Sequence, residues 1–167
     1  MERDRDESGR PRNARARDAL GRPLPDGVDG VPRIPDDLNI PAAETLAYAQ
    51  DLLDDGRAFH AHEVFEAAWK NGPDDERTLW QGLAQLAVGI THLQRGNPTG
   101  AATLLRRACS LLAEVAGEPH GIDIPGLVTA GTMLADDVTA GAAIAPERLK
   151  PALTRGTEFP EAASKTV

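Results

Sequence analysis

The sequence contains a single cysteine, Cys109, among 167 residues. An internal disulfide is therefore excluded, and so is a metal cluster held by several thiolates of one chain. A lone cysteine on a helix is most often a small, partly buried apolar residue, and a nucleophilic role is the less common alternative. The chain must be stabilised by its hydrophobic core.

Aromatic residues are also scarce, at 4% of the chain. The core must then be built mainly from Leu, Ala, Val and Ile. A chain of this length is expected to form one domain with a core of its own. No apolar run approaches the ~18 residues of a transmembrane helix, and the N-terminus lacks the apolar stretch of a signal peptide. We expect a cytoplasmic protein that does not bind membranes.

The sequence has fewer basic than acidic residues. The formal net charge is −8, and most of it lies after Pro41, because the preceding segment carries nearly equal numbers of basic and acidic residues. Phosphate neutralisation requires clustered Lys and Arg. An acidic domain is therefore not expected to bind nucleic acid or an anionic membrane surface.

Helical periodicity dominates what the sequence does contain. Apolar residues recur at a spacing of three and four, and Gly, Pro and Asn separate the periodic segments. This pattern predicts an all-α fold, a single compact bundle of about five helices. The expected helices span residues 42–55, 59–69, 74–95, 98–116 and 125–140, followed by a short helical turn at 146–150.

Composition divides the chain into three parts. Residues 1–38 are rich in charge, Pro and Gly, which predicts a disordered tail, although the Pro-containing part could lie against the domain as an extended strap. Residues 39–145 form the expected helical domain. Residues 146–167 are expected to be a loosely packed C-terminal segment.

The segment 59–69 combines a helical pattern with polar chemistry. On a helical wheel, His62 and Glu66 fall on the same face as Phe65 and Trp69, which we take as the core-facing side. A histidine and a carboxylate at positions i and i+4 lie within mutual reach. Burying either group without a partner is costly, so this face predicts a site. Two neighbours, His60 and Val64, are expected to point elsewhere.

The spacing resembles H-E-x-x-H, in which two histidines of one helix bind zinc and the glutamate is the base. Here Glu66 replaces the second histidine, and His62 and Glu66 remain compatible with a divalent metal such as zinc. We expect a third ligand, His92, from the next helix, and Glu63 as the catalytic residue. The remaining candidate binding residues are polar or aromatic side chains of the same two helices: Trp69, Gln81 and Gln85.

Three motifs in order resemble one family. They are Phe59-x-x-His62-Glu63-x-x-Glu66-x-x-Trp69, then Gln81-Gly82-Leu83-x-Gln85-x-Ala87, then His92-x-x-x-Gly96-Asn97-x-x-Gly100-Ala101. The pattern resembles the DUF309 family, small bacterial and archaeal helical proteins of unknown function, over residues 44–116. The family's H-x-x-x-E-x-x-[W/Y] hallmark is matched by His62, Glu66 and Trp69. The resemblance implies a helical fold and a metal-binding motif, and it supplies no reaction.

Two functions stay open at this point. In the first, His62 and Glu66 belong to a polar or metal-binding site between two helices, which would support metal-dependent hydrolysis of a small molecule. In the second, the pair is a buried staple inside a non-catalytic helical interaction module. The sequence leaves open the substrate, the protein partner, and whether the chain forms a homo-oligomer.

Overall fold

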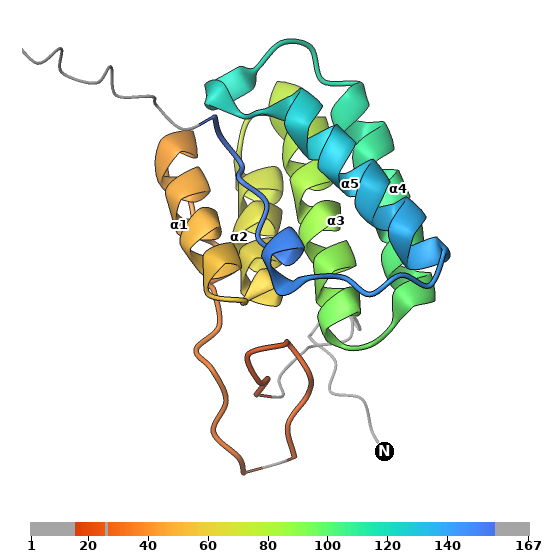
Figure 1. The fold of residues 1–167 in the computed structure, drawn as a ribbon. Coiled ribbons are helices and arrows are strands. Elements are labelled where there is room, and N and C mark those ends of the chain that lie inside the picture. The colour runs from red at the N-terminus through yellow and green to blue at the C-terminus, as the bar shows by residue number, and fades with distance from the viewer. Residues whose placement is uncertain (1–15, 26, 156–167) are drawn as a thin grey trace, which may run out of the picture.

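Five α-helices joined by short turns form the body of the protein (Figure 1). In a computed structural model of the chain, residues 16–25 and 27–155 are described. This part of the chain contains no strand beyond two isolated bridges, which confirms the predicted all-α class. The helices are α1 (Ala42–Asp54), α2 (Ala58–Asn71), α3 (Arg77–Gln94), α4 (Pro98–Ala113) and α5 (Ile124–Thr139), with 3₁₀ turns η1 (Asp74–Glu76), η2 (Pro119–Gly121) and η3 (Pro146–Leu149).

Successive helices run in opposite directions and pack on one another in chain order, so that α3 lies between α2 and α4 (Figure 1). The sequence predicts this central place for α3, because that helix is apolar over most of its circumference. Ten of its residues are buried: Leu79, Trp80, Gly82, Leu83, Ala84, Leu86, Ala87, Gly89, Ile90 and Thr91.

Two glycines of α3 allow α4 to approach closely. A Cβ atom added at Gly82 would lie 2.9 Å from Leu112 Cδ2, and one at Gly89 would lie 2.9 Å from Leu105 Cδ2. Real Cβ atoms rarely make such short contacts. Small residues on this flank are therefore a requirement of the α3–α4 packing.

The turn between α3 and α4 follows its sequence signal. Gly96 adopts a φ of 76° and ends α3. The side-chain oxygen of Asn97 accepts a hydrogen bond from the backbone N–H of Gly100 at 3.1 Å, and Pro98 occupies the first turn of α4. This short connection places α3 and α4 side by side.

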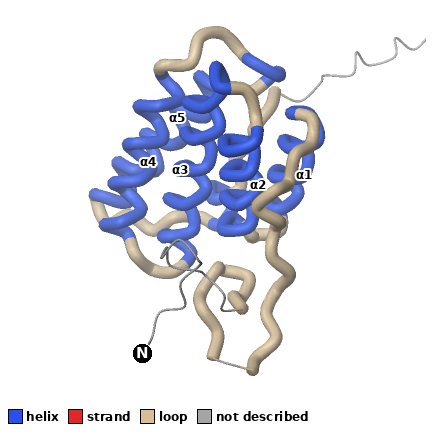
Figure 2. Tube along the Cα trace, turned by 180° about the vertical axis from the view of Figure 1, so that it is seen from behind, coloured by secondary structure: helices blue, strands red, loops and turns tan. Residues whose placement is uncertain are grey.

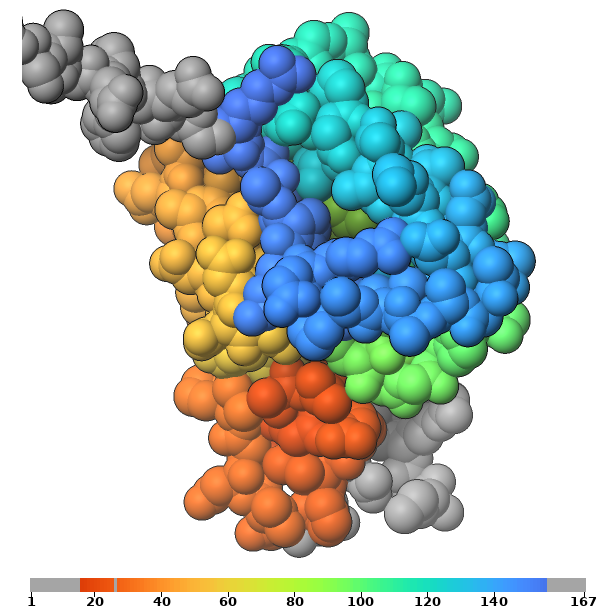
Figure 3. All heavy atoms as spheres, viewed as in Figure 1, coloured from red at the N-terminus to blue at the C-terminus, as the bar shows by residue number. Residues whose placement is uncertain are grey.

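An irregular segment before α1 lies against the bundle (Figures 2 and 3). We call it the N-terminal strap, and it comprises residues 16–25 and 27–41. The strap begins at the end of the bundle where α2 starts and then runs along α2. Ile34 is buried in the core cluster. The side-chain amide of Asn71 donates hydrogen bonds to the carbonyl oxygens of Asp36 and Leu38, each at 3.1 Å. Ile34, Asp36 and Leu38 thus contact the domain, whereas Val28 is 46% exposed and a Cβ at Gly27 would meet no atom within 4 Å. Residues 1–15 of the expected tail lie outside the described residues.

The C-terminal segment returns across the bundle beside α1 (Figures 1 and 3). Leu153 is only 1% exposed. Gln50 of α1 accepts a hydrogen bond from the Leu153 N–H at 2.8 Å and donates one to the Pro151 carbonyl at 3.0 Å. One leucine and a reciprocal amide pair thus anchor residues 151–153, while the rest of residues 146–155 are partly or fully exposed. Residues 156–167 lie outside the described part.

Across the residues that the structure describes, none of the helices combines the length and apolar character needed to cross a membrane.

Candidate functional site

The core-facing side of α2 differs from the predicted one. His60 and Val64 are 1% and 0% exposed, whereas the side chains of His62 and Glu66 are 22% and 33% exposed. Phe59 falls on the same face of the helical wheel as His62 and Glu66, so the wheel counts it as core-facing. Phe59 is instead covered by the N-terminal strap, since a Cβ at Gly21 would overlap its ring.

The motif residues line a cavity of about 160 Å³ between α2 and the strap. We call it the α2 pocket. It lies outside the bundle core, because every lining residue belongs to α2 or to the strap. These residues are Arg33, Asp36, Phe59, His62, Glu63, Glu66, Ala67 and Lys70.

Three polar side chains along α2 form a connected chain in this pocket. His62 Nε2 lies 3.3 Å from Glu66 Oε2, and Lys70 Nζ lies 2.7 Å from Glu66 Oε1. The hydrogen bond from His62 and the nearby Lys70 ammonium lower the pKa of Glu66 to about 2, against the opposing effect of burial. Glu66 is therefore an ionised acceptor with both oxygens engaged. The pair lies within one helix, so it does not staple two helices together.

Glu63, the expected catalytic residue, behaves in the opposite way. Burial raises the pKa of its carboxyl group, although Arg33 and the backbone N–H of Ile34 oppose the rise. Its Oε2 accepts that N–H at 3.3 Å. Its Oε1 is buried and has no hydrogen-bond partner within the described part of the chain. Glu63 therefore retains an unused acceptor inside the pocket wall.

His62 offers a second unused atom. Its Nε2 faces Glu66, while its Nδ1 is buried and has no partner in residues 16–25 and 27–155. A neutral imidazole that donates from Nε2 carries a lone pair on Nδ1. Buried polar atoms are nearly always satisfied in native proteins. Two such atoms, from neighbouring residues of α2, lie at this one cavity.

The other predicted site residues are not brought to this pocket. His92 Nδ1 contacts the Asn97 side chain at 3.0 Å, at the α3–α4 turn. Gln81 and Gln85 lie on α3, partly buried, and no described hydrogen bond joins either one to His62. Trp69 packs against the hydrophobic core. A site shared by His62, Glu66 and the polar side chains of α3 stays a prediction; the pocket that His62 and Glu66 line is completed by the strap and includes no α3 residue.

The donor set does not fit a zinc site. Within the described residues, no group of three His, Cys, Asp or Glu side chains is arranged to hold a metal ion. The expected ligands His62 and Glu66 are not joined by His92. Lys70 also occupies one oxygen of Glu66, and an ammonium group competes with a metal cation for the same carboxylate. We derive no chemistry through a metal.

Three charged residues of the α2 pocket, Arg33, Asp36 and Lys70, are not among the predicted site residues. Lys70 was detectable, because it lies four positions after Glu66 on the same helix. Arg33 and Asp36 carried no such signal, since they lie on an irregular segment about 30 residues upstream. Only the folded strap brings them to α2.

Comparison with known proteins supports the family resemblance. Residues 46–104 match the model of the DUF309 family, described as a domain of unknown function. "Uncharacterized protein YpuF" of Bacillus subtilis (strain 168) is 38% identical over 55 residues, which is 32% of either chain. An "Uncharacterized protein" of Aquifex aeolicus (strain VF5) is 28% identical over 83 residues, or 49% of this chain and 25% of that protein. The chain therefore spans a third or less of these curated relatives. No solved structure matches.

Proposed function

Because residues 46–104 match a family without a known function, we propose a function from the geometry of the site: the protein is a small-molecule-binding helical module, and the α2 pocket is its binding site. The observation that carries this proposal is the unpartnered Oε1 of Glu63, buried at a cavity of about 160 Å³. A cavity of that size accepts a ligand of a few heavy atoms or one group of a larger ligand.

The free atoms of the pocket define the ligand's chemistry. Glu63 Oε1 is an acceptor when the carboxyl group is ionised, and His62 Nδ1 is an acceptor when Nε2 carries the only ring proton. The cation Lys70 is already engaged by Glu66 at 2.7 Å. The ligand therefore presents hydrogen-bond donors, and an amidine, an amide or a primary amine meets that requirement. An acceptor-only anion does not.

Glu63 is also the residue suited to exchange a proton with such a ligand. Two neighbouring carboxyl groups whose pKa values are pushed apart can serve separate roles in acid–base chemistry. Glu66, with a pKa of about 2, holds His62 in place, while burial keeps the Glu63 pKa above its usual value. Reaction of the bound ligand would use Glu63 as the proton acceptor or donor.

Acetamidinium and acetate provide a matched pair of probes, because they share a planar shape and differ in donor and acceptor character. We expect acetamidinium, titrated at pH 8 into ¹⁵N-labelled protein, to shift the backbone amide signals of residues 33–36 and 59–70, and acetate to leave them in place. The variant Glu63→Gln should weaken acetamidinium binding about tenfold, the range of a charge-assisted hydrogen bond.

The variant Glu147→Gln is the control, since Glu147 is exposed and lies outside the α2 pocket, and its replacement should leave acetamidinium binding unchanged. Equal binding of acetate, or undiminished binding by Glu63→Gln, would contradict the proposal.

A further inference from the structure

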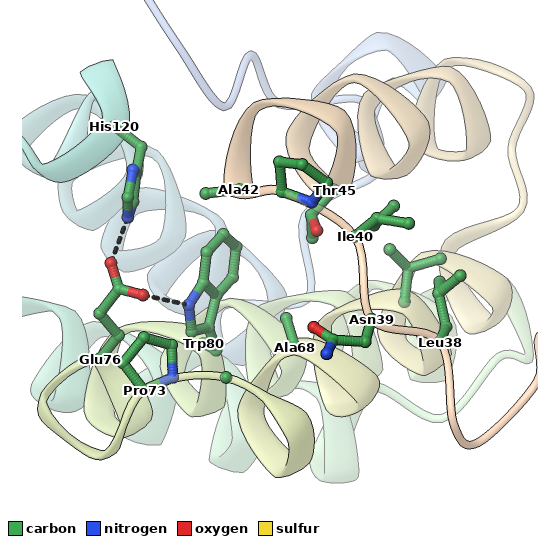
Figure 4. Close-up of a pocket in the computed structure, with 13 residues that line it drawn as sticks. Leu38, Asn39, Ile40, Ala42, Thr45, Ala68, Pro73, Glu76, Trp80 and His120 are labelled. Carbon is green, nitrogen blue, oxygen red and sulfur yellow. Dashed lines mark hydrogen bonds and ion pairs between the residues drawn. The ribbon is translucent and has the colours of Figure 1, made fainter.

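A second, larger cavity lies at the other end of α2. It shares no lining residue with the α2 pocket. It has a volume of about 320 Å³ and lies where the end of α2, the start of α3, the start of α1 and η2 meet. We call it the Trp80 pocket (Figure 4). Its size is at the lower end of the range for small-molecule sites.

The wall of the Trp80 pocket is mostly apolar. Leu38 and Ile40 of the strap, Ala68 of α2 and Trp80 of α3 line it (Figure 4), together with Val64 of α2. Trp80 is 2% exposed and packs against the ring of Phe65, with centroids 6.4 Å apart. The core therefore fixes the apolar wall in place.

One carboxylate provides the charge of this pocket. Glu76 is the sole Asp, Glu, Lys or Arg side chain among the lining residues that the structure describes. Its Oε1 pairs with His120 Nε2. Its Oε2 lies 3.5 Å from Trp80 Nε1, at the limit of a hydrogen bond, so this oxygen keeps acceptor capacity. The side chain is 22% exposed, and a ligand can therefore reach it.

His120 closes the carboxylate side of the pocket. Its ring stacks on Trp80 with centroids 6.0 Å apart, and the same ring contacts Glu76 (Figure 4). The residue adopts a φ of 56°, a conformation that L-residues seldom adopt. The turn of η2 thus holds the imidazole over Glu76 and Trp80 at the expense of a local backbone preference, which is typical of residues kept for a contact.

We propose that the Trp80 pocket binds a small organic cation with an apolar body, such as an arylalkylamine. The ammonium group pairs with Glu76, and the apolar body packs between Ile40, Val64 and Ala68. Charge complementarity selects the sign of the ligand, because no Lys or Arg lines the described wall and a carboxylate ligand would face Glu76. The net charge of −8 attracts cations to the protein as a whole.

The experiment uses the full chain with Trp69→Phe, which leaves Trp80 as the single tryptophan reporter. We expect 2-phenylethylamine to change the Trp80 fluorescence in a saturable manner and 3-phenylpropionate, which has the same ring and a similar chain, to cause no saturable change. The variant Glu76→Gln should weaken binding of the amine about tenfold. Ala68→Leu keeps Glu76 but fills the pocket, and it should abolish binding.

The matched control is Glu147→Gln, because Glu147 is exposed and lies outside the Trp80 pocket, so its replacement should leave binding of the amine unchanged. Binding of both probes with similar affinity, undiminished binding by Glu76→Gln, or no saturable binding of the amine would each overturn the proposal. If Glu76→Gln does not fold, as judged by far-ultraviolet circular dichroism, the proposal is tested by Ala68→Leu and by the comparison of the two probes. Loss of acetamidinium binding at the α2 pocket alone would refute only the function proposed above.

Discussion

Glu63 and Glu66 lie three residues apart on α2 and line the same cavity, yet their pKa values are shifted in opposite directions. Burial dominates at Glu63, whose Oε1 has no partner among the described residues. At Glu66 the hydrogen bond from His62 dominates, supported by Lys70. Their replacements by glutamine should therefore affect stability with opposite signs.

Glu66→Gln should destabilise the protein at neutral pH. The pKa of Glu66 is lowered from 4.5 to about 2 in the native state, so its contribution is complete above pH ~5 and is lost as the pH falls towards 2. We expect a loss of about 1 kcal/mol at pH 7, since solvent screens a side chain that is one-third exposed. Urea denaturation of wild type and variant at pH 7 and pH 3 measures it. A loss that is equal at both pH values would contradict the assignment.

Glu63→Gln should stabilise the protein at pH 8. The native pKa of Glu63 is raised by burial, so the wild type is relatively favoured at low pH and loses that advantage as the pH rises through the native pKa. We expect a gain of about 0.5–1 kcal/mol at pH 8, as is common at functional sites, and none at pH 4. Thermal unfolding tests this, with exposed Glu147→Gln as control. Destabilisation at pH 8 would show that the carboxylate has a structural partner.

Gly21→Ala should release the strap from Phe59. Gly21 has a φ of +75°, and a Cβ there would overlap the Phe59 ring. Gly27→Ala is the matched control, because Gly27 has a φ of +81° and no atom within 4 Å of the added Cβ. Both variants bear the backbone strain of ~1–2 kcal/mol, and Gly21→Ala alone has the clash. Trypsin should cleave Gly21→Ala about tenfold faster within the strap. Equal cleavage rates would mean that Phe59 does not anchor it.

Leu153→Ala should destabilise the whole domain by about 2–4 kcal/mol, as for other buried leucines, because Leu153 is 1% exposed. Lys150→Ala, at an exposed position of the same segment, should change stability by less than ~0.5 kcal/mol. Urea denaturation of the two variants provides the comparison. A loss below ~1 kcal/mol for Leu153→Ala would return the segment to the loosely packed state that the sequence predicts.

The helices follow from local sequence. Apolar spacing and the Gly96-Asn97-Pro98 signal predict the boundaries of α3 and α4 within a few residues, because helix termini depend on caps and breakers that lie next to them. The central place of α3 follows as well, since a helix that is apolar on most sides must be covered on most sides. The confirmed family resemblance rests on these same segments.

The orientation of α2 does not follow from its own pattern. Phe59 made one face look core-directed, but Arg17 and Arg95 lie over its ring at 5.3 and 5.5 Å from the centroid. A helical wheel reports where apolar residues gather and does not report which segment covers them. His60, which the wheel points away from the core, is 1% exposed.

The sequence by itself determined the all-α class, the helix order and the presence of a polar motif at His62 and Glu66, because those properties depend on residues three or four positions apart. The tertiary structure decided what surrounds that motif: the strap with Arg33, and not the α3 seam with His92. It also created the Trp80 pocket, where Glu76 and His120 meet across 44 residues. Contacts between distant segments depend on the path of the whole chain, and no local period encodes that path.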